Sequence, residues 1–433
     1  MLIQFSIKNF KCFKEEAKLS MVASNYDKAT REEYNIFEVE KFGLRLLKSA
    51  VVYGANASGK TKLIEGLGFM KDFIYTSSKE SQINEAIDTD PFRLNSETLG
   101  EPSVFEIIFI HENNMYRYGF EVDKKQVHAE WLYRKSKIKE VELFYRENQN
   151  FEVHRTFKVA DLVENDRVRP NALLLSVAAN FNDKIARKIF EWFSNFNIIS
   201  GLHEGGYEPF SISNISKNEQ SKKRTVKFLK SADLGIEDLA ISKMEINDLP
   251  EGMPDEMKDF LRKQMKERDI TEFASGVSTY HQVFDTNNLF EDLSEFSMEE
   301  DESSGTKKYF ALSGPILETL EKGEILIVDE LANKLHPNLV CKLMELFNSK
   351  EKNPNNAQLI FNTHDTNLLS SDIFRRDQIW FVEKDRYGAS SLYSLGNFKS
   401  DTVRKEDNYE KNYIRGKYGA IPYLGDFNKL FTF

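Results

Sequence analysis

The amino-acid sequence predicts an α/β fold with a parallel core sheet, an antiparallel β lobe and an inserted, mainly helical region. A short apolar run over 50–53 leads into a glycine-rich loop, and apolar residues then recur at helical spacing from 63 to 74. Beyond residue 323, apolar strands alternate with helical segments, which predicts parallel strands. The range 101–134 is rich in short apolar segments separated by turn residues, which predicts antiparallel hairpins.

An antiparallel sheet is predicted after the first helix, from strands over 104–110, 115–122 and 127–134. An edge strand over 2–7 and a second strand over 18–22 are predicted at the N-terminus. Residues 112–114, Glu-Asn-Asn, are typical of a hairpin turn between two of these strands.

The segment from 54 to 61 matches the phosphate-binding pattern G-x-x-x-x-G-K-[ST]. Two glycines let the backbone turn closely, so that successive N–H groups point at phosphate oxygens. Lys60 can reach the β- and γ-phosphates of a nucleotide such as ATP, and the Thr61 hydroxyl can ligate Mg²⁺. The predicted phosphate-binding residues are Gly54, Ala55, Asn56, Ala57, Ser58, Gly59, Lys60 and Thr61.

Two acids end the apolar strand predicted over 325–328. Asp329 can hold Mg²⁺ directly or through water, and Glu330 can polarise the attacking water. An acid at the carboxyl end of a parallel strand is common in α/β proteins, so the pair alone is a weak motif. The phosphate-binding loop upstream strengthens its assignment to a nucleotide site, because Mg·ATP needs such an acid. A helix over 339–347 and strands over 358–361 and 378–382 are predicted to follow.

Two further segments are candidate phosphate contacts. His364 follows the next apolar strand and is predicted to face the same crevice, where it can contact the γ-phosphate; a purely structural histidine is the alternative. Ser303, Ser304 and Gly305 precede an apolar helical pattern, and the N–H groups and hydroxyls at such a helix start bind anions. By itself, this second pattern indicates only a helix cap.

The chain divides into three predicted regions. Residues 1–134 contain the phosphate-binding loop and the β lobe, and residues 301–433 contain the acidic pair and His364. The range 135–300 is predicted to be a largely helical insertion of unknown specificity, with helical periodicity over 186–196 and a highly charged helix or arm over 255–269.

Composition limits the class of protein. With 433 residues, 40% of them hydrophobic and 30% charged, the chain is predicted to be soluble and globular. The absence of a signal-peptide core and of an 18-residue apolar run predicts a cytoplasmic protein without a membrane span. The two cysteines, Cys12 and Cys341, favour a reducing compartment. The net charge of −10 argues against a surface that coats DNA, and the basic run over 222–230 reads as a solvated helix face or as a phosphate track.

The order of these motifs resembles that of the ABC-type ATPases of the SMC, RecF and OLD group, and most closely the abortive-infection ATPases of the RloA/AbiLi type. Supporting segments are residues 7–13, Ile-Lys-Asn-Phe-Lys-Cys-Phe, and residues 413–422, Tyr-Ile-Arg-Gly-Lys-Tyr-Gly-Ala-Ile-Pro. In this resemblance Ser303, Ser304 and Gly305 match the signature motif, residues 331–337 the D-loop and His364 the switch histidine. The signature departs from the transporter pattern Leu-Ser-Gly-Gly, and no Q-loop glutamine is assigned.

The resemblance implies an ATPase whose two heads sandwich two Mg·ATP, with Lys60 of one head and Ser304 of the other at each nucleotide. It further implies an anti-phage switch that controls a separate effector, such as a Toprim-like or RloB-like nuclease. Two alternatives stay open at this point. One is a RecF-like clamp that binds duplex DNA, and the other is a small-molecule kinase, for which Ser304 and His364 would have no role.

Overall fold

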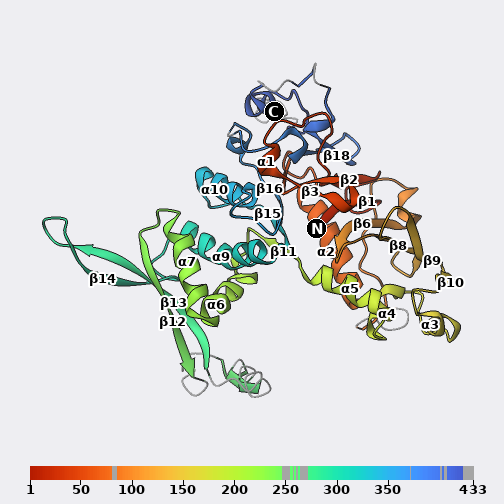
Figure 1. Ribbon diagram of the computed structural model, residues 1–433, viewed down its shortest axis with the longest axis horizontal. Coiled ribbons are helices and arrows are strands. Elements are labelled where there is room, and N and C mark those ends of the chain that lie inside the picture. The colour runs from red at the N-terminus through yellow and green to blue at the C-terminus, as the bar shows by residue number, and fades with distance from the viewer. Residues whose placement is uncertain are drawn as a thin grey trace, which may run out of the picture. The chain divides into compact units, whose positions relative to one another are not determined.

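The computed structural model describes residues 1–79, 85–245, 254–256, 258–259, 262–263, 272–370, 372–399, 402–403 and 407–422 (Figure 1). The chain forms two compact units. Unit 1 comprises Met1–Ile199, Thr319–Ala332 and Val340–Phe433, and unit 2 comprises Ser200–Glu318 and Asn333–Leu339. Most of the charged segment predicted over 255–269 lies outside the described residues.

A six-stranded sheet forms the core of unit 1, with the strand order β11-β15-β16-β5-β17-β18. Its strands are β11 (Phe196–Ser200), β15 (Ile325–Asp329), β16 (Gln358–Asn362), β5 (Ser49–Tyr53), β17 (Ile379–Lys384) and β18 (Ser390–Ser394). Strands β15, β16, β5 and β17 run parallel, whereas β18 pairs antiparallel with β17. Every residue of β5, β15 and β16 is buried, which is why these strands read as continuous apolar runs. The predicted fold class is confirmed.

Parallel pairing brings three strand ends to one edge of this sheet. Val328 of β15 pairs with Phe361 of β16, and Asn362 of β16 pairs with Val52 of β5. The chain therefore leaves β15, β16 and β5 side by side at their carboxyl ends, where open α/β sheets bind ligands.

An antiparallel seven-stranded sheet forms the lobe of unit 1, in the order β10-β9-β8-β7-β6-β1-β2. Its strands are β1 (Leu2–Lys8), β2 (Ala17–Ser20), β6 (Ser103–His111), β7 (Asn114–Val122), β8 (Val127–Lys135), β9 (Glu140–Glu147) and β10 (Asn150–Val153). The hairpin predicted around residues 112–114 is confirmed as β6–β7. The prediction of an edge strand at the N-terminus is wrong, because β1 lies between β6 and β2.

Helix α2 (Lys60–Thr76) joins the two sheets of unit 1 into one core. Its Phe69 ring lies 4.9 Å from that of Phe105 on β6, and its Phe73 ring lies 5.5 Å from that of Phe120 on β7. Further elements of unit 1 are α1 (Glu32–Asn35), β3 (Ile36–Val39), β4 (Leu44–Leu47), α3 (Ala160–Glu164), α4 (Leu174–Asn180), α5 (Lys184–Ser194) and α11 (Tyr409–Ile414). The helix that starts at the phosphate-binding loop is thus fixed to the lobe by aromatic contacts.

Unit 2 contains α6 (Glu208–Lys217), α7 (Glu219–Lys230) and an antiparallel sheet of β12 (Ile236–Glu245), β13 (Glu272–Phe284) and β14 (Phe290–Ser297). Helix α9 (Ser304–Lys322) begins in this unit and ends in unit 1, and α10 (Pro337–Asn348) also spans both. The largely helical range predicted over 135–300 is therefore wrong in part, since it also contains strands β9 to β14. No residue of β14 is buried, so the alternation by which a half-buried strand is recognised is missing there.

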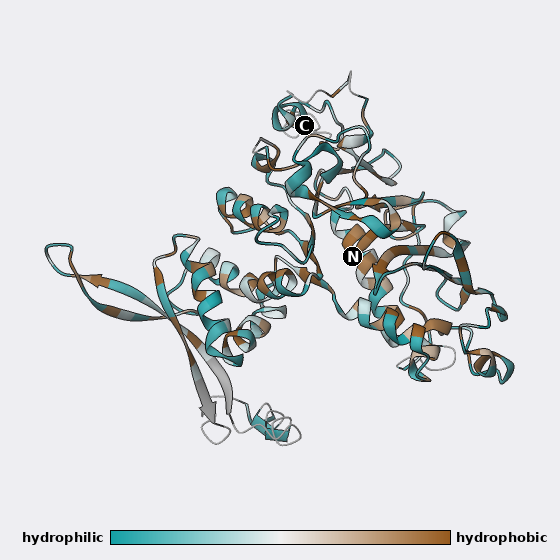
Figure 2. Ribbon diagram, in the orientation of Figure 1, coloured by the Kyte–Doolittle hydropathy of each residue, from teal (hydrophilic) through white to brown (hydrophobic). Residues whose placement is uncertain are grey.

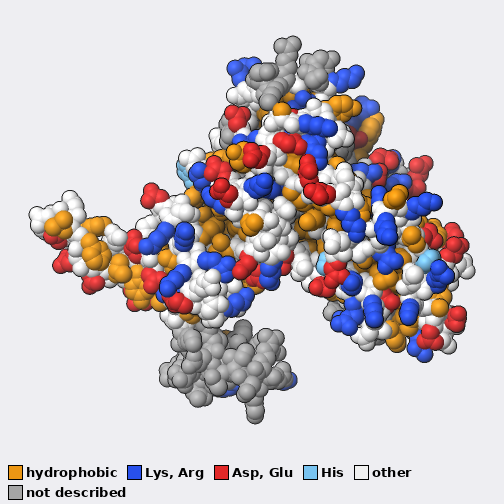
Figure 3. Space-filling view, in the orientation of Figure 1, with side chains coloured by type: hydrophobic (Ala, Val, Ile, Leu, Met, Phe, Trp, Pro, Cys, Tyr) orange, Lys and Arg blue, Asp and Glu red, His pale blue; other side chains and the backbone are white. Residues whose placement is uncertain are grey.

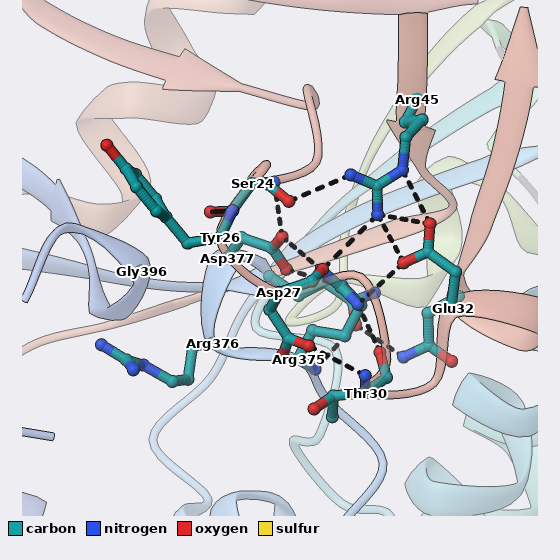
Figure 4. A network of polar contacts seen from close by, with 12 residues as sticks. Ser24, Tyr26, Asp27, Thr30, Glu32, Arg45, Arg375, Arg376, Asp377 and Gly396 are labelled. Carbon is teal, nitrogen blue, oxygen red and sulfur yellow. Dashed lines mark hydrogen bonds and ion pairs between the residues drawn. The ribbon is translucent and has the colours of Figure 1, made fainter. Parts of the chain in front are cut away.

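A buried arginine ties the N-terminal loop of unit 1 to the segment before β17 (Figure 4). The Arg375 side chain is fully buried and donates to both carboxylate oxygens of Asp377, at 3.0 and 2.9 Å. It also donates to the Asp27 carbonyl at 2.7 Å and approaches the Glu32 carboxylate at 3.3 Å. The Asp377 carboxylate accepts a further bond from the Ser24 N–H at 2.7 Å. These bonds fix the segment that leads into β17, the strand beside β5.

Among the helices described, none combines the length and apolar character needed to cross a membrane.

The buried pair gives a stability prediction. Replacing Arg375 with Ala leaves the carboxylate of Asp377 buried without its counter-charge, so the free energy of unfolding should fall by about 3–5 kcal/mol. Urea denaturation followed by circular dichroism measures this change. The matched control is Arg386→Ala, because Arg386 is exposed in the turn between β17 and β18 and its loss should cost about 0.5 kcal/mol or less. Equal losses in the two variants would contradict the assignment.

Candidate functional site

The loop from 54 to 61 wraps closely because two of its residues lack a Cβ. A Cβ on Gly54 would collide with the carbonyl oxygen of Val382, and one on Gly59 would lie 2.5 Å from the Sγ of Cys12. Gly59 also has a φ of +116°, which other residues rarely adopt. Helix α2 begins directly after it, at Lys60, so its free N–H groups face the loop.

Lys60 folds back over this loop. Its Nζ donates to the carbonyl oxygens of Gly54, at 2.9 Å, and Ala55, at 3.2 Å. Burial lowers the pKa of Lys60, while the nearby carboxylates of Glu330 and Asp329 oppose that shift. The ammonium group is therefore held inside the loop with two acids facing it.

Thr61 and Asp329 come together although they lie far apart in the sequence. The Thr61 hydroxyl donates to Oδ1 of Asp329 at 3.0 Å, and the side-chain amide of Asn362 donates to the same oxygen. A hydroxyl and a carboxylate beside a phosphate-binding loop are oxygen ligands of the kind that Mg²⁺ prefers. The residues present therefore fit a magnesium ion.

Glu330 is held in a left-handed backbone conformation, with a φ of +59°. Its N–H donates to Oδ1 of Asn362 at 2.6 Å, and Oε1 of its carboxylate lies 3.3 Å from Nε2 of His364. Such conformations are costly for a residue with a side chain and cluster at functional sites. Burial and the charge of Lys60 lower the pKa of His364, and Glu330 opposes them, so the histidine is predominantly neutral at pH 7.

These side chains surround a cavity of about 710 Å³ within unit 1. It is lined by Lys11, Cys12, Asn56, Ala57, Ser58, Gly59, Lys60, Thr61, Lys62, Asp90, Pro91, Phe92, Arg93, Leu94, Glu330, His364, Lys384 and Gly388. Cavities of this size accommodate small ligands such as nucleotides. The structure thus brings together the predicted loop, Glu330 and His364 around one space, with Asp329 directly behind Thr61.

Sequence reasoning missed several residues of this site. Asn362 links the two acids, and its place at the end of a strand beside the acidic one is a signal that could have found it. Lys11 and Cys12 lie in the N-terminal segment that supported the family resemblance, and the segment 90–94 lines the cavity beside them, since the Lys11 N–H donates to the Asp90 carbonyl oxygen at 2.6 Å. Lys384 is the last residue of β17 and has no local sequence signal.

Ser303, Ser304 and Gly305 belong to unit 2, where they form the start of α9. The Ser303 hydroxyl accepts a bond from the Thr306 N–H at 3.1 Å, which realises the helix cap. Ser303 and Ser304 are exposed, and a Cβ on Gly305 would lie 2.9 Å from the carbonyl oxygen of Lys334. Gly305 of the predicted signature and Lys334 of the predicted D-loop are therefore neighbours in unit 2, and the two serines are exposed to solvent.

A model of one protein family, described as "AAA domain, putative AbiEii toxin, Type IV TA system", matches residues 49–370. The match spans the phosphate-binding loop, the acidic pair and His364. The chain belongs to this AAA family. It is accordingly an ATP-binding P-loop ATPase of the ABC type, with the loop and Glu330 lining one cavity and Asp329 bonded to Thr61 beside it. The RloA/AbiLi type within that class stays a prediction.

Solved structures with a similar fold include heads of SMC proteins and an ATP-binding cassette. The SMC head domain from Thermotoga maritima has a TM-score of 0.41 at 11% identity, covering 91% of this chain and 98% of that one. An Smc head from Pyrococcus furiosus has a TM-score of 0.31 at 13% identity, covering 91% and 96%. A dimeric ATP-binding cassette bound to ADP and Pi has a TM-score of 0.27 at 11% identity, covering 91% and 100%. These similarities carry no information about function, and no curated protein sequence matches the chain.

The bridging role of Asn362 gives a prediction for this AAA ATPase. Replacing Asn362 with Ala removes the group that orients Glu330 and Asp329, so steady-state ATP hydrolysis should fall about 10- to 100-fold. Phosphate release measures the rate, and fluorescent-nucleotide titration should show that binding is largely retained. The control is Asn367→Ala, an exposed asparagine after the same strand. An Asn362→Ala variant with wild-type turnover would contradict the positioning role.

Proposed function

We propose that this ATPase is an ATP-hydrolysing switch of a prokaryotic anti-phage system of the abortive-infection kind. The observation that carries the proposal is the convergence of Lys60, Thr61, Asp329, Glu330 and His364 at one sheet edge. These five side chains supply the charge, the metal ligands, the water-orienting acid and the phosphate sensor that phosphoryl transfer to water needs. The family description, which names a toxin and a toxin–antitoxin system, supports the defence context.

Each residue has one role in this proposal. Lys60 neutralises charge on the β- and γ-phosphates, and Thr61 with Asp329 holds Mg²⁺, which when bound neutralises the phosphate oxygens further. Glu330 orients the attacking water, and its fixed backbone keeps the carboxylate in place. His364 contacts the γ-phosphate, and its Nε2 lies 3.3 Å from Oε1 of Glu330, which places that contact beside the water-orienting acid.

The switch itself is proposed to be a dimer of two heads. The exposed serines at the start of α9 offer an anion site that this cavity does not use, and Ser303, Ser304 and Gly305 are proposed to bind the ATP of the partner head. The γ-phosphate stabilises the closed dimer only through contacts that ADP cannot make. Hydrolysis therefore opens the dimer, which turns ATP turnover into a timed signal.

The effector is proposed to be a separate protein, a Toprim-like or RloB-like nuclease, in the cytoplasm. In the part of the chain that the structure describes, only His111, Glu112 and Glu191 lie close enough to share a metal ion outside the nucleotide cavity. Glu112 is paired with Lys188, so this exposed group is a weak candidate for a nuclease centre. A toxic activity controlled by this ATPase is thus better assigned to another chain.

The RecF-like alternative predicts a surface for duplex DNA. The best candidate is the basic helix α7, but Lys222 pairs with Asp238 at 3.0 Å and Lys230 pairs with Glu237. This partial neutralisation weakens a phosphate track. ATP-dependent binding of duplex DNA by the purified chain would favour this alternative over a protein effector.

The first prediction of this proposed function concerns nucleotide binding. Replacing Lys60 with Ala removes the charged donor of the loop and should weaken ATP binding by about 10- to 100-fold, as expected for a charge-assisted hydrogen bond. Isothermal titration calorimetry measures the affinity. Lys342→Ala is the control, because Lys342 is exposed on α10, pairs with Glu345 and does not line the cavity. Tight ATP binding by Lys60→Ala would contradict the loop assignment.

The second prediction tests the water-orienting acid and the switch. Glu330→Gln keeps the shape of the side chain but removes its charge, so hydrolysis should fall by about 100-fold or more while Mg·ATP is retained. Light scattering should then show an assembly with ATP that is larger than the one formed with ADP, because only ATP holds the heads together. Glu345→Gln is the control, because this side chain is 41% exposed on α10 and pairs with Lys342 away from the cavity. Unchanged turnover would remove Glu330 from its role.

The defence role is tested in cells. A plasmid carrying this gene with its neighbouring reading frame should protect bacteria from phage, and Glu330→Gln should abolish or lock that response. Protection by the ATPase gene alone, without any neighbour, would contradict a separate effector.

A further inference from the structure

The strands β13 and β14 form a hairpin whose far end exposes apolar side chains to solvent. Phe284 is 53% exposed, Phe290 60% and Leu293 41%, and Leu289 in the turn is 64% exposed. Phe284 pairs directly with Phe290 across the strands, so the two rings belong to the same face of the hairpin. Figure 1 shows this end of the hairpin extending away from α6 and α7, and Figure 2 shows brown segments along it. Clustered exposed apolar residues of this kind mark interaction sites.

The same segment is uniformly acidic. From Gly276 to Glu302 the chain has no lysine or arginine, and its acids are Asp285, Glu291, Asp292, Glu295, Glu299, Glu300, Asp301 and Glu302. Glu291, Asp292 and Glu295 are exposed beside the apolar residues and make no ion pair with any described residue. We call residues 276–302 the acidic arm. Its charge repels nucleic acid and favours a basic protein surface.

Hydrogen bonds and a ring contact anchor the base of the acidic arm, whereas Leu289, Phe290 and Glu291 at its tip are exposed. At the base, Oε1 of Glu302 bonds the Thr279 hydroxyl at 2.6 Å and lies 2.7 Å from Nε2 of His281. The His281 ring in turn lies 4.7 Å from that of Phe296. These contacts fix the start of the arm, so less entropy is lost when its exposed tip binds a partner than if the whole arm had to be ordered.

A complementary surface lies on the same unit. Helix α7 carries five cations in twelve residues, and its buried residues Thr225, Phe228 and Leu229 leave Lys223 and Lys227 exposed to solvent. The neighbouring helix α6 exposes Phe210, which is 39% exposed. Figure 3 shows blue side chains over α7 and orange and red ones along the arm. This basic surface with an apolar residue matches the acidic arm in both charge and hydrophobicity.

The arm of one chain does not occupy α7 of that chain. The sheet order is β12-β13-β14, and α7 packs on β12, so β14 lies two strands away from it. A second copy is the partner that offers this surface in every cell that contains the protein. We propose that two copies associate reciprocally, with the tip of each acidic arm docked on the α6–α7 surface of the other.

This contact is isologous, since each chain gives its arm and receives one. It needs no nucleotide, because neither surface belongs to the ATP cavity. Together with the head dimer of the proposed function it gives each chain two different self-contacts, which allows rings larger than a dimer. The contact can exist whether or not the heads dimerise around ATP.

The experiment is sedimentation velocity of the full chain in EDTA without nucleotide, which excludes head dimerisation. The expected result is a reversible dimer that weakens as salt is raised, because salt screens the charge contacts. The double variant F284S/F290S should weaken the dimer at least about tenfold, as expected for losing two apolar anchors. A chain that stays monomeric at all concentrations, or a dimer that F284S/F290S leaves unchanged, would overturn the proposal.

A charge swap tests the partner surface. The variants E291K/D292K and K223E/K227E should each be monomeric, because like charges then meet in both contacts of the homodimer. An equimolar mixture should restore the dimer, since both contacts in the mixed pair again join opposite charges. The control is E147K/E152K, which reverses two exposed acids on the β9–β10 hairpin and should leave association unchanged. A mixture that associates no better than either variant alone would refute docking on α7. Near-ultraviolet circular dichroism of each variant verifies folding.

Discussion

The parallel pairing of β16 with both β15 and β5 is the constraint on which the nucleotide site depends. It fixes the register in which Asp329, Asn362 and the loop after Tyr53 leave the sheet at one edge. Asn362 then connects the two acids, because its side-chain NH₂ donates to Asp329 and its side-chain oxygen accepts the N–H of Glu330. A one-residue slip of β16 would exchange its buried faces and would break both contacts at once. The apolar strands around it therefore preserve the site as well as the core.

Electrostatic balance within the cavity follows from this geometry. One ammonium group, two carboxylates and one imidazole lie close together, so the pKa values of Lys60 and His364 depend on the charges around them. The acids raise the pKa of Lys60 against the effect of burial, and Lys60 acts with burial to lower that of His364. A neutral histidine can donate a hydrogen bond to a phosphate without adding charge, and an ammonium can neutralise one. The division of labour proposed for these residues thus agrees with their surroundings.

The two units expose different kinds of binding surface. Unit 1 recognises a small anion through backbone N–H groups and buried charges, which demands fixed geometry and two glycines that tolerate no side chain. Unit 2 presents exposed apolar and acidic side chains on a hairpin with no buried residue in β14, which suits a partner of broad surface. The proposed ATP-dependent contact through Ser303, Ser304 and Gly305 and the proposed contact of the acidic arm use different residues, so the two proposals can be tested separately.

The sequence by itself determined the phosphate-binding loop, the acidic pair and the alternation of strands and helices, because each depends on neighbours within a few residues. The spacing of Gly54, Gly59 and Lys60 predicts a phosphate-binding loop, and the unbroken apolar runs of β5 and β15 predict buried strands. Only the tertiary structure decided that Asn362 bridges the two acids, that Cys12 lies against Gly59 and that Arg375 locks a loop more than 340 residues away. It also decided the strands of the acidic arm, whose side chains lack the buried alternation that reveals a strand. Long-range contacts and solvent-exposed strands produce no recognisable pattern in a single sequence. Tight loops and buried strands do, because their residues must satisfy local spacing or burial.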